Sequence, residues 1–399
     1  MSGPVSGGVR LAGMVRPSSR IDGFGTTIFA EMSALAARTG AVNLGQGFPD
    51  TSGPPELLER ARAAIASGDN QYAPGLGTPE LRAAIVRHQA RHHGVELDAD
   101  TQVVVTTGAT EAIAAAVLGL VDAGDEVVVI EPFYDSYVAM IRMAGAVPVP
   151  VTLRAPDFRL PVEDLQAVIG PRTRAIMVNT PHNPTGAVLS DEELTALAEL
   201  AERHDLTVIS DEVYEHLTFD GVRHRPVATV PGLADRTVTI SSAGKSFSVT
   251  GWKIGWATGP AHLVEAVMAA KQWLSYTSGT PFQGAVAWAL DHADDFVADL
   301  ARQLQDQRDR LCDGLEAVGF GVIRPQATYF ATTDIRPLGF DDGLDFCRRL
   351  PELAGVVAVP HQVLHLDPEP GRPFVRWAFC KRPEVIDEAL TRLRRLSPA

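Results

Sequence analysis

Short apolar runs alternate with stretches of helical periodicity over most of the chain. The apolar runs lie near Val103, Val127, Ile176, Val208 and Val238, and the helical stretches near Ala112, Leu194 and Val264. Continuous apolar runs are typical of parallel strands buried on both faces, and strands that alternate with helices predict a parallel sheet covered by helices. The pattern therefore predicts an α/β fold with a mostly parallel sheet.

The pattern changes in the last quarter of the chain. Helical periodicity through 296–318 and 383–396 brackets strand-like stretches near Tyr329 and Val375, which is typical of an α+β arrangement. We therefore expect a flexible tail at 1–20, an N-terminal segment at 21–58 that packs with the small domain, a large domain at 59–295 and a small C-terminal domain at 296–399.

Composition agrees with a globular protein and excludes some partners. The chain has 399 residues, 45% hydrophobic and 21% charged, enough for two domains. A net charge of −14 argues against nucleic acid and anionic membranes as partners, because both require clustered lysine and arginine.

The first twenty residues are basic, like a transit peptide, but they lack the apolar run of a secretion signal. No apolar stretch of the sequence is long enough to span a bilayer. We expect a cytoplasmic protein.

The cysteines and histidines predict neither a disulfide nor a metal site. The three cysteines, Cys312, Cys347 and Cys380, are widely spaced, and no Cys-x-x-Cys pair is present. The eleven histidines show no metalloprotease-like spacing, and the pair His92-His93 is typical of a helix end. We expect no metal.

Lys245 stands among small and hydroxyl residues in the segment 241–253, SSAGKSFSVTGWK. A lysine becomes a nucleophile when burial or a nearby cation lowers its pKa. Without further context such a lysine is structural or faces solvent. Its neighbours along the chain favour a Schiff-base lysine instead.

Polar side chains follow two apolar runs upstream. Asp211 ends the run at 208–210, and Asn183 lies in a loop with two prolines and a glycine after the run at 175–178. Since parallel strands present their carboxyl ends at one edge of a sheet, both side chains are expected at a ligand edge. Gly108, Ala109 and Thr110 open a helical stretch directly after the run at 103–107, so their amides can face an anion.

These parts together match the requirements of a pyridoxal phosphate site. The cofactor needs a lysine for its imine, an acid for its ring nitrogen, donors for its phenolate oxygen and a phosphate cradle. We assign Asp211 to the ring nitrogen and Asn183 and Tyr214 to the phenolate oxygen. Tyr134 would lie flat against the ring, while Ser242 and Lys253 would complete the cradle begun at the helix start.

In this order the motifs resemble those of the class I and II aminotransferases, the fold-type I family of pyridoxal phosphate enzymes. The segments 43–50, NLGQGFPD, and 131–137, EPFYDSY, are similar to a narrower branch. That branch holds kynurenine and glutamine transaminases, methionine aminotransferases and actinobacterial N-succinyldiaminopimelate aminotransferases. The resemblance runs from about residue 43 to Arg376.

The resemblance implies a seven-stranded large domain that binds the cofactor, a smaller α+β domain, and a homodimer with shared active sites. It makes Lys245, Asp211 and Tyr214 the catalytic residues, with Lys245 moving the proton between the substrate and the cofactor. It also implies that Tyr72 reaches the phosphate of the neighbouring subunit. Arg376, beside Gly47 and Asn183, would clamp the substrate carboxylate, as suits a planar guanidinium.

The implied activity is ping-pong transfer of an amino group from an amino acid to a 2-oxo acid, with 2-oxoglutarate as the expected acceptor. A cysteine S-conjugate β-lyase, a decarboxylase or acyl-transferring synthase of the same fold, and a non-catalytic binding domain are the alternatives. Lys245 argues against the last of these, while the cofactor residues do not separate the others.

The residues expected around the substrate identify it less specifically than the cofactor motifs identify the family. The segment after Tyr276, TSGTPFQ, lacks the aromatic and histidine pair of kynurenine transaminases, and Glu111 stands where some aspartate aminotransferases have a lysine. Both differences favour a long donor such as N-succinyldiaminopimelate over kynurenine or aspartate, with glutamine and methionine as alternatives. Phe29 and Tyr276 are candidates for substrate contacts or for ordinary packing aromatics.

Overall fold

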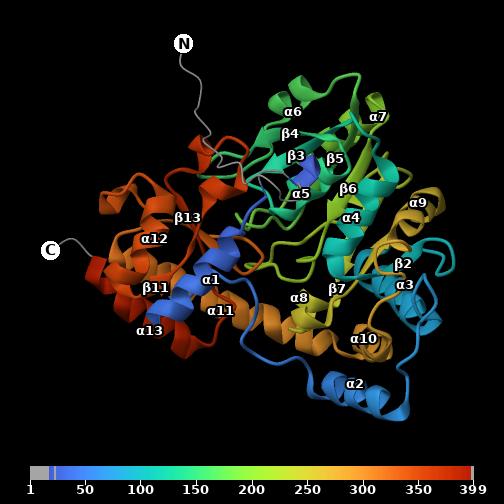
Figure 1. Cartoon of the computed structure of the whole chain (residues 1–399), viewed down its shortest axis with the longest axis horizontal. Coiled ribbons are helices and arrows are strands. Elements are labelled where there is room, and N and C mark those ends of the chain that lie inside the picture. Colours follow the sequence, from blue (N-terminus) through green and yellow to red (C-terminus); the bar gives the residue numbers. More distant parts are fainter. Residues whose placement is uncertain (1–17, 22–23, 397–399) are drawn as a thin grey trace, which may run out of the picture.

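A computed structural model describes residues 18–21 and 24–396 of the chain, and Figure 1 shows its arrangement. The large sheet and its helices form one part, and the C-terminal helices gather with α1 at its side. Of the predicted tail at 1–20, residues 1–17 lie outside the described residues, and Ser19–Ile21 form a short 3-10 helix.

A seven-stranded, mostly parallel sheet forms the core of the large domain, as predicted. Its strand order is β2-β8-β7-β6-β5-β3-β4, and β8 alone runs antiparallel to both of its neighbours. The strands are β2 (Val103–Thr107), β3 (Glu126–Glu131), β4 (Val147–Thr152), β5 (Thr173–Asn179), β6 (Thr207–Asp211), β7 (Thr237–Ser242) and β8 (Ile254–Thr258).

Alternation along the strands divides the sheet into two buried faces. Val127 and Val129 of β3 pack toward α4 (Gly108–Leu120), α5 (Ser136–Met143) and α9 (Ala261–Lys271). Val128 and Ile130 pack on the opposite face, toward α6 (Val162–Val168) and α7 (Asp191–Arg203). Because successive side chains of a strand point to opposite faces, a continuous apolar run serves both helix layers.

A further group of helices covers the edge of the sheet at β2 and β8. Apolar residues of α2 (Pro55–Ser67), α3 (Pro79–His93) and α10 (Thr280–His292) pack together with Val103, Val105 and Trp256. α8 (Ala243–Ser246) follows β7 directly. This group therefore supports the end of β2 and the turn after β7, where predicted site residues lie.

The small domain is an α+β layer. Its antiparallel sheet has the order β12-β13-β10-β9, and β1 pairs with β11 in parallel. The strands are β1 (Val42–Asn43), β9 (Gly321–Ile323), β10 (Phe330–Asp334), β11 (Val356–Val357), β12 (Val359–Pro360) and β13 (Phe374–Ala378). The helices are α1 (Ile28–Thr39), α11 (Asp294–Val318), α12 (Gly343–Ala354) and α13 (Pro383–Leu393).

The predicted domain limits fall inside helices. Residue 58 lies within α2, which packs against α10, and residue 295 lies in the first turn of α11. α1 and β1 contact α12 and β11 of the small domain, the packing expected of the N-terminal segment. The division at these two residues stays a prediction. Among the described residues, no helix combines the length and apolar character needed to cross a membrane.

Candidate active site

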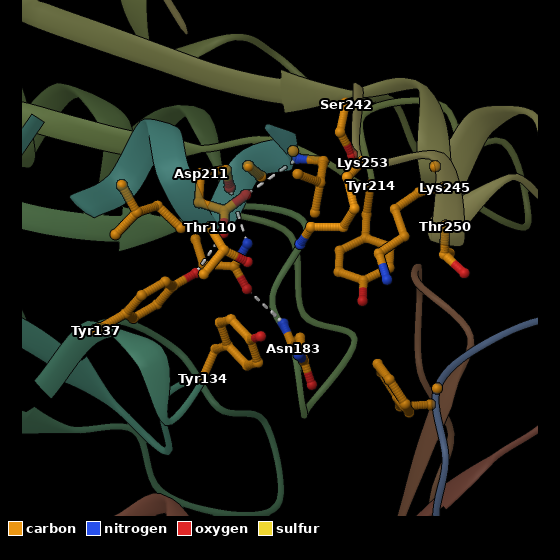
Figure 2. A pocket seen from close by; sticks show the side chains of 18 of the residues that line it. Thr110, Tyr134, Tyr137, Asn183, Asp211, Tyr214, Ser242, Lys245, Thr250 and Lys253 are labelled. Carbon is orange, nitrogen blue, oxygen red and sulfur yellow. Dashed lines mark hydrogen bonds between the residues drawn. The ribbon is translucent and has the colours of Figure 1, made fainter. Parts of the chain in front are cut away.

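A cavity of about 340 Å³ lies at the carboxyl ends of the large sheet. Asn179 ends β5, Asp211 ends β6 and Ser242 ends β7, and all three line the cavity. Phe330 and Arg376 close it from the small domain. Open α/β sheets bind their ligands at this edge, and Figure 2 shows the side chains that converge there.

Lys245 projects into the cavity from α8. Its Nζ donates a hydrogen bond to the Tyr329 hydroxyl, at 2.8 Å, and lies 5.7 Å from the ring centroid of Tyr214. Burial lowers the pKa of Lys245 to about 8. A Cβ at the preceding residue, Gly244, would meet the Thr250 backbone at 3.0 Å, so a larger residue there would require this backbone to shift. The result is an amine that can be neutral near physiological pH.

Asp211 is a buried carboxyl group at the end of β6. Tyr137 donates a hydrogen bond to its Oδ2 at 2.6 Å, and the Val213 amide donates to Oδ1 at 3.3 Å. Burial raises the pKa of Asp211 to about 6, and these hydrogen bonds and the charge of Lys245 oppose that rise. The site therefore has a carboxylate that a cation can readily stabilise.

Arg376 lies across the cavity on β13, 2% exposed. Its Nη1 donates to Asn183 Oδ1 at 3.0 Å and its Nη2 to the Gly45 carbonyl at 2.9 Å. Among the described residues its Nε has no hydrogen-bond partner. The rings of Phe29 and Phe330 flank the guanidinium, with centroids 4.9 and 4.0 Å from Cζ. Burial lowers the pKa of Arg376 to about 10, so a small anion would be stabilised here.

The start of α4 forms an anion cradle. Gly108 has a φ of +71°, and a Cβ at that position would lie 3.3 Å from Lys253 Nζ. A Cβ at Gly255 would meet the Gly108 and Ala109 backbone at 2.6 to 2.7 Å, so β8 approaches this turn only because Gly255 lacks a side chain. The amides of a helix start, with a lysine beside them, attract phosphate groups.

Comparison with known proteins identifies the family. The sequence profile of the family described as "Aminotransferase class I and II" matches residues 39–393. This chain belongs to the class I and II aminotransferases. The family and branch predicted from the motifs are therefore confirmed, and the protein is an aminotransferase with the fold-type I architecture.

The relatives of this aminotransferase match it over about three quarters or more of their length. The probable N-succinyldiaminopimelate aminotransferase of Mycobacterium tuberculosis is 55% identical, over 94% of this chain and 97% of its own. A solved structure of the M. tuberculosis enzyme has a TM-score of 0.94, covering 96% of this chain and all of that one. The methionine aminotransferase of Escherichia coli is 38% identical over 95% and 98% of the two chains. Kynurenine–oxoglutarate transaminase 3 of Mus musculus is 40% identical over 83% and 77%.

The aminotransferase cavity collects most residues that the sequence analysis singled out. They come from both domains and from segments far apart in the chain. They are Phe29, Gly47, Gly108, Ala109, Thr110, Tyr134, Asn183, Asp211, Tyr214, Ser242, Lys245, Lys253 and Arg376. Their individual roles stay predictions.

Tyr72 and Tyr276 lie outside this cavity. Tyr72 is 81% exposed and Tyr276 52% exposed, and their rings pack edge to face at 5.5 Å. A role for Tyr276 against substrate therefore needs a site other than the cavity of its own chain. For Tyr72, the expected contact with a neighbouring subunit is compatible with this exposure.

Several residues of the site escaped the sequence analysis, and Tyr137 and Tyr329 are the two that hold predicted groups in place. Tyr137, which holds Asp211, lies within the EPFYDSY segment, three residues after Tyr134, so its spacing could have indicated it. Tyr329, which holds Lys245, lies 84 residues from its partner. No local pattern links such a pair.

Proposed function

We propose that this aminotransferase uses pyridoxal 5′-phosphate as cofactor and reversibly transfers an amino group between N-succinyldiaminopimelate and 2-oxoglutarate, a reaction whose reverse direction serves lysine biosynthesis. The observation that carries the proposal is the presence of the buried Lys245 amine, the Asp211 carboxyl group and the Arg376 guanidinium in one cavity. The place of action that we propose is the cytoplasm, where the soluble metabolites of such a pathway occur.

The donor set of the cavity fits the proposed cofactor. Asp211 can pair with a cationic ring nitrogen, which would favour its ionised form. Asn183 uses Oδ1 to accept from Arg376, which leaves its Nδ2 to donate to a phenolate oxygen, together with the Tyr214 hydroxyl. The start of α4, Ser242 and Lys253 can hold the phosphate. When bound, the cofactor supplies an electron sink for the bond that breaks at the substrate Cα.

Lys245 is the proposed acid and base. With a pKa of about 8, its amine is partly neutral at neutral pH and can accept the Cα proton and then return it. Tyr329 keeps the amine in place, because its hydroxyl donates to the Gly47 carbonyl at 2.6 Å and accepts from Lys245 Nζ. An amine held at one point of the cavity would shorten the path of the proton between substrate and cofactor.

Arg376 is the proposed clamp for the α-carboxylate. The contacts with Asn183 and Gly45 fix the plane of the guanidinium, and Nε is free to donate among the described residues. Phe29 and Phe330 exclude water from its faces, so an ion pair formed there is stronger than at the surface. The clamp orients the Cα proton toward Lys245.

The choice of donor rests on the relatives and on the pocket. The relative named as a probable N-succinyldiaminopimelate aminotransferase is 55% identical to this chain, while the methionine and kynurenine enzymes are 38% and 40% identical. The segment after Tyr276 has small residues in place of bulky aromatics. Like Tyr276, it does not line the cavity of its own chain, so it bears on the donor only through the neighbouring subunit of the proposed dimer. Methionine and kynurenine are the competing donors.

A homodimer is the proposed assembly. The aromatic side chains of Tyr72, Trp273 and Tyr276 are exposed, Trp273 at 83%, and the rings of Tyr72 and Tyr276 pack edge to face. Large exposed aromatics of this kind mark protein interfaces. In the proposed dimer, Tyr72 of one subunit contacts the cofactor phosphate of the other.

The test is a comparison of donors at saturating 2-oxoglutarate, with glutamate formation as the readout. N-succinyl-LL-diaminopimelate should have a kcat/KM at least about tenfold above those of methionine, glutamine and kynurenine. A higher value for one of these would move the substrate assignment to that donor. Pyruvate and ammonia released from a cysteine S-conjugate, without glutamate, would make the protein a β-lyase.

A further inference from the structure

A cluster of three histidines and one glutamate lies beside Ser241 of β7. His88 and His93 come from the last turns of α3, and Glu215 and His216 from the turn that follows β6. The two segments are more than 120 residues apart in sequence. We call these four residues the histidine–glutamate cluster. None of its members has a part in the proposed aminotransferase mechanism.

The potential ligand atoms of the cluster point at one another. His93 Nε2 lies 2.7 Å from Glu215 Oε2, and His216 Nε2 lies 2.9 Å from His88 Nε2. One ligand atom each from His93, Glu215 and His216 falls within 4.8 Å of the others. Tetrahedral zinc, with bonds of about 2.0 to 2.1 Å, places its ligand atoms about 3.4 Å apart. Small side-chain rotations would bring the cluster to that spacing.

The cluster is largely buried, as a closed four-coordinate metal site requires. His88 is 4% exposed. The His93 and Glu215 side chains are 6% and 2% exposed. Ser241 donates a hydrogen bond to the second carboxylate oxygen of Glu215, which orients the first oxygen as the outer shell of a metal site does.

Without a metal, the 2.9 Å contact between His88 Nε2 and His216 Nε2 is a hydrogen bond between two neutral imidazoles. A bound cation would displace the proton of this bond, and both nitrogen lone pairs would then face the ion. His92, whose ring centroid is 5.0 Å from that of His216, instead contacts Asp294 through Nε2 and is left out of the ligand set.

We propose that His93, Glu215 and His216, with His88 as the fourth ligand, bind one divalent transition-metal ion of the zinc class. Three imidazoles and one carboxylate in a closed, four-coordinate arrangement suit Zn²⁺, and Co²⁺ can replace it. The site is independent of the proposed cofactor and substrate.

The position of the metal site gives it a structural role. Glu215 directly follows Tyr214, and its partner Ser241 directly precedes Ser242. A bound ion would tie the end of α3 to the chain segments that carry these two active-site residues. Metal binding would therefore stabilise the fold beneath the cofactor site without contact to cofactor or substrate.

The test is a Co²⁺ titration of the untagged, chelator-treated holoenzyme, followed by Zn²⁺ competition and calorimetry. We expect one equivalent per chain, visible absorption typical of four-coordinate Co²⁺, and its loss on addition of Zn²⁺. The variants His93→Gln and His216→Gln should weaken binding by about 100-fold or more. His204→Gln, at an exposed position after α7, is the matched control and should bind as the wild type does.

Each remaining outcome overturns the proposal. These are no saturable binding by the wild type, unchanged binding by both cluster variants, or an equal loss in the His204→Gln control. Thermal unfolding of each variant checks its fold, and Glu215→Gln, which keeps the shape and the contact with Ser241, replaces any variant that does not fold. Transamination by a protein that binds no metal would leave the proposed function intact.

Discussion

At the scale of single residues, burial sets the chemistry of this aminotransferase. It lowers the pKa values of Lys245 and Arg376 and raises that of Asp211, so each group is held nearer its neutral form than it would be in water. A ligand that brings the opposite charge reverses this effect. Burial of these charged groups therefore destabilises the protein without ligand, and it strengthens their interactions with a ligand of opposite charge.

Arg376→Ala removes the proposed carboxylate clamp. We expect kcat/KM to fall by about 10²- to 10³-fold for every α-amino acid donor, because a buried charge pair is lost. Steady-state kinetics with several donors measures it. Arg336→Ala is the control, since Arg336 is an exposed residue paired with Asp334. An unchanged kcat/KM in Arg376→Ala would place the clamp elsewhere.

Tyr137→Phe removes a hydrogen bond that favours the ionised form of Asp211. The Asp211 pKa is raised to about 6, so the carboxylate is present above that pH and is lost as the pH falls through it. Affinity of the apoprotein for pyridoxal phosphate should decline over the same range. In Tyr137→Phe the midpoint of the decline should move up by about one pH unit.

Cofactor titrations monitored by absorbance at a series of pH values measure this midpoint. Tyr276→Phe, at an exposed position outside the cavity, should keep the wild-type profile. A Tyr137→Phe midpoint equal to that of the wild type would mean that Asp211 does not govern cofactor affinity.

Residues whose role depends on a local motif were predictable from the sequence. Lys245 was recognised from the loop of small residues around it, and Asp211 from its place at the end of an apolar strand. Tyr329 does not, because the contact between its hydroxyl and Lys245 joins two domains. Only the fold brings such residues together.

At the scale of elements, glycine positions hold the phosphate cradle together. β8 lies against the turn between β2 and α4, and a Cβ at Gly255 would overlap backbone atoms there. The apolar run of β8 was not recognised in the sequence, and neither was its antiparallel direction, because apolar content does not encode strand direction.

Gly255→Ala should force β8 away from the start of α4. We expect a loss of about 1 to 3 kcal/mol in the free energy of unfolding, together with weaker cofactor binding. Denaturant unfolding and cofactor titration measure the two effects. Gly284→Ala, inside α10 with no atom near the new Cβ, is the control and should be neutral or slightly stabilising. Equal behaviour of the two variants would contradict the close approach.

At the scale of the whole molecule, the site as described in one chain leaves Tyr72 exposed. The layered α/β and α+β architecture was predictable from the periodicity and the alternation of elements. The histidine–glutamate cluster was not, because its ligands come from two distant segments and no linear spacing relates them. Our metal proposal opposes the prediction, made from the sequence, that the chain binds no metal.

Hybrid dimers test the proposed sharing of the active site. Tyr72→Ala and Lys245→Ala should each impair activity, and unfolding and refolding them together yields dimers with one variant subunit of each kind. If Tyr72 acts across the interface, these hybrids contain one intact site, and an equal mixture should recover about a quarter of the wild-type activity. No recovery would mean that Tyr72 acts within its own chain or not at all.

The central claim is that Lys245 moves the proton in an amino transfer from N-succinyldiaminopimelate. The most direct measurement mixes the holoenzyme with N-succinyl-LL-diaminopimelate in the absence of any acceptor and follows the cofactor absorbance in a stopped-flow instrument. We predict full conversion to the pyridoxamine form with one 2-oxo acid per site, and a rate at least about 10³-fold lower in Lys245→Ala. No conversion by the wild type, or a near-wild-type rate in the variant, would contradict the account.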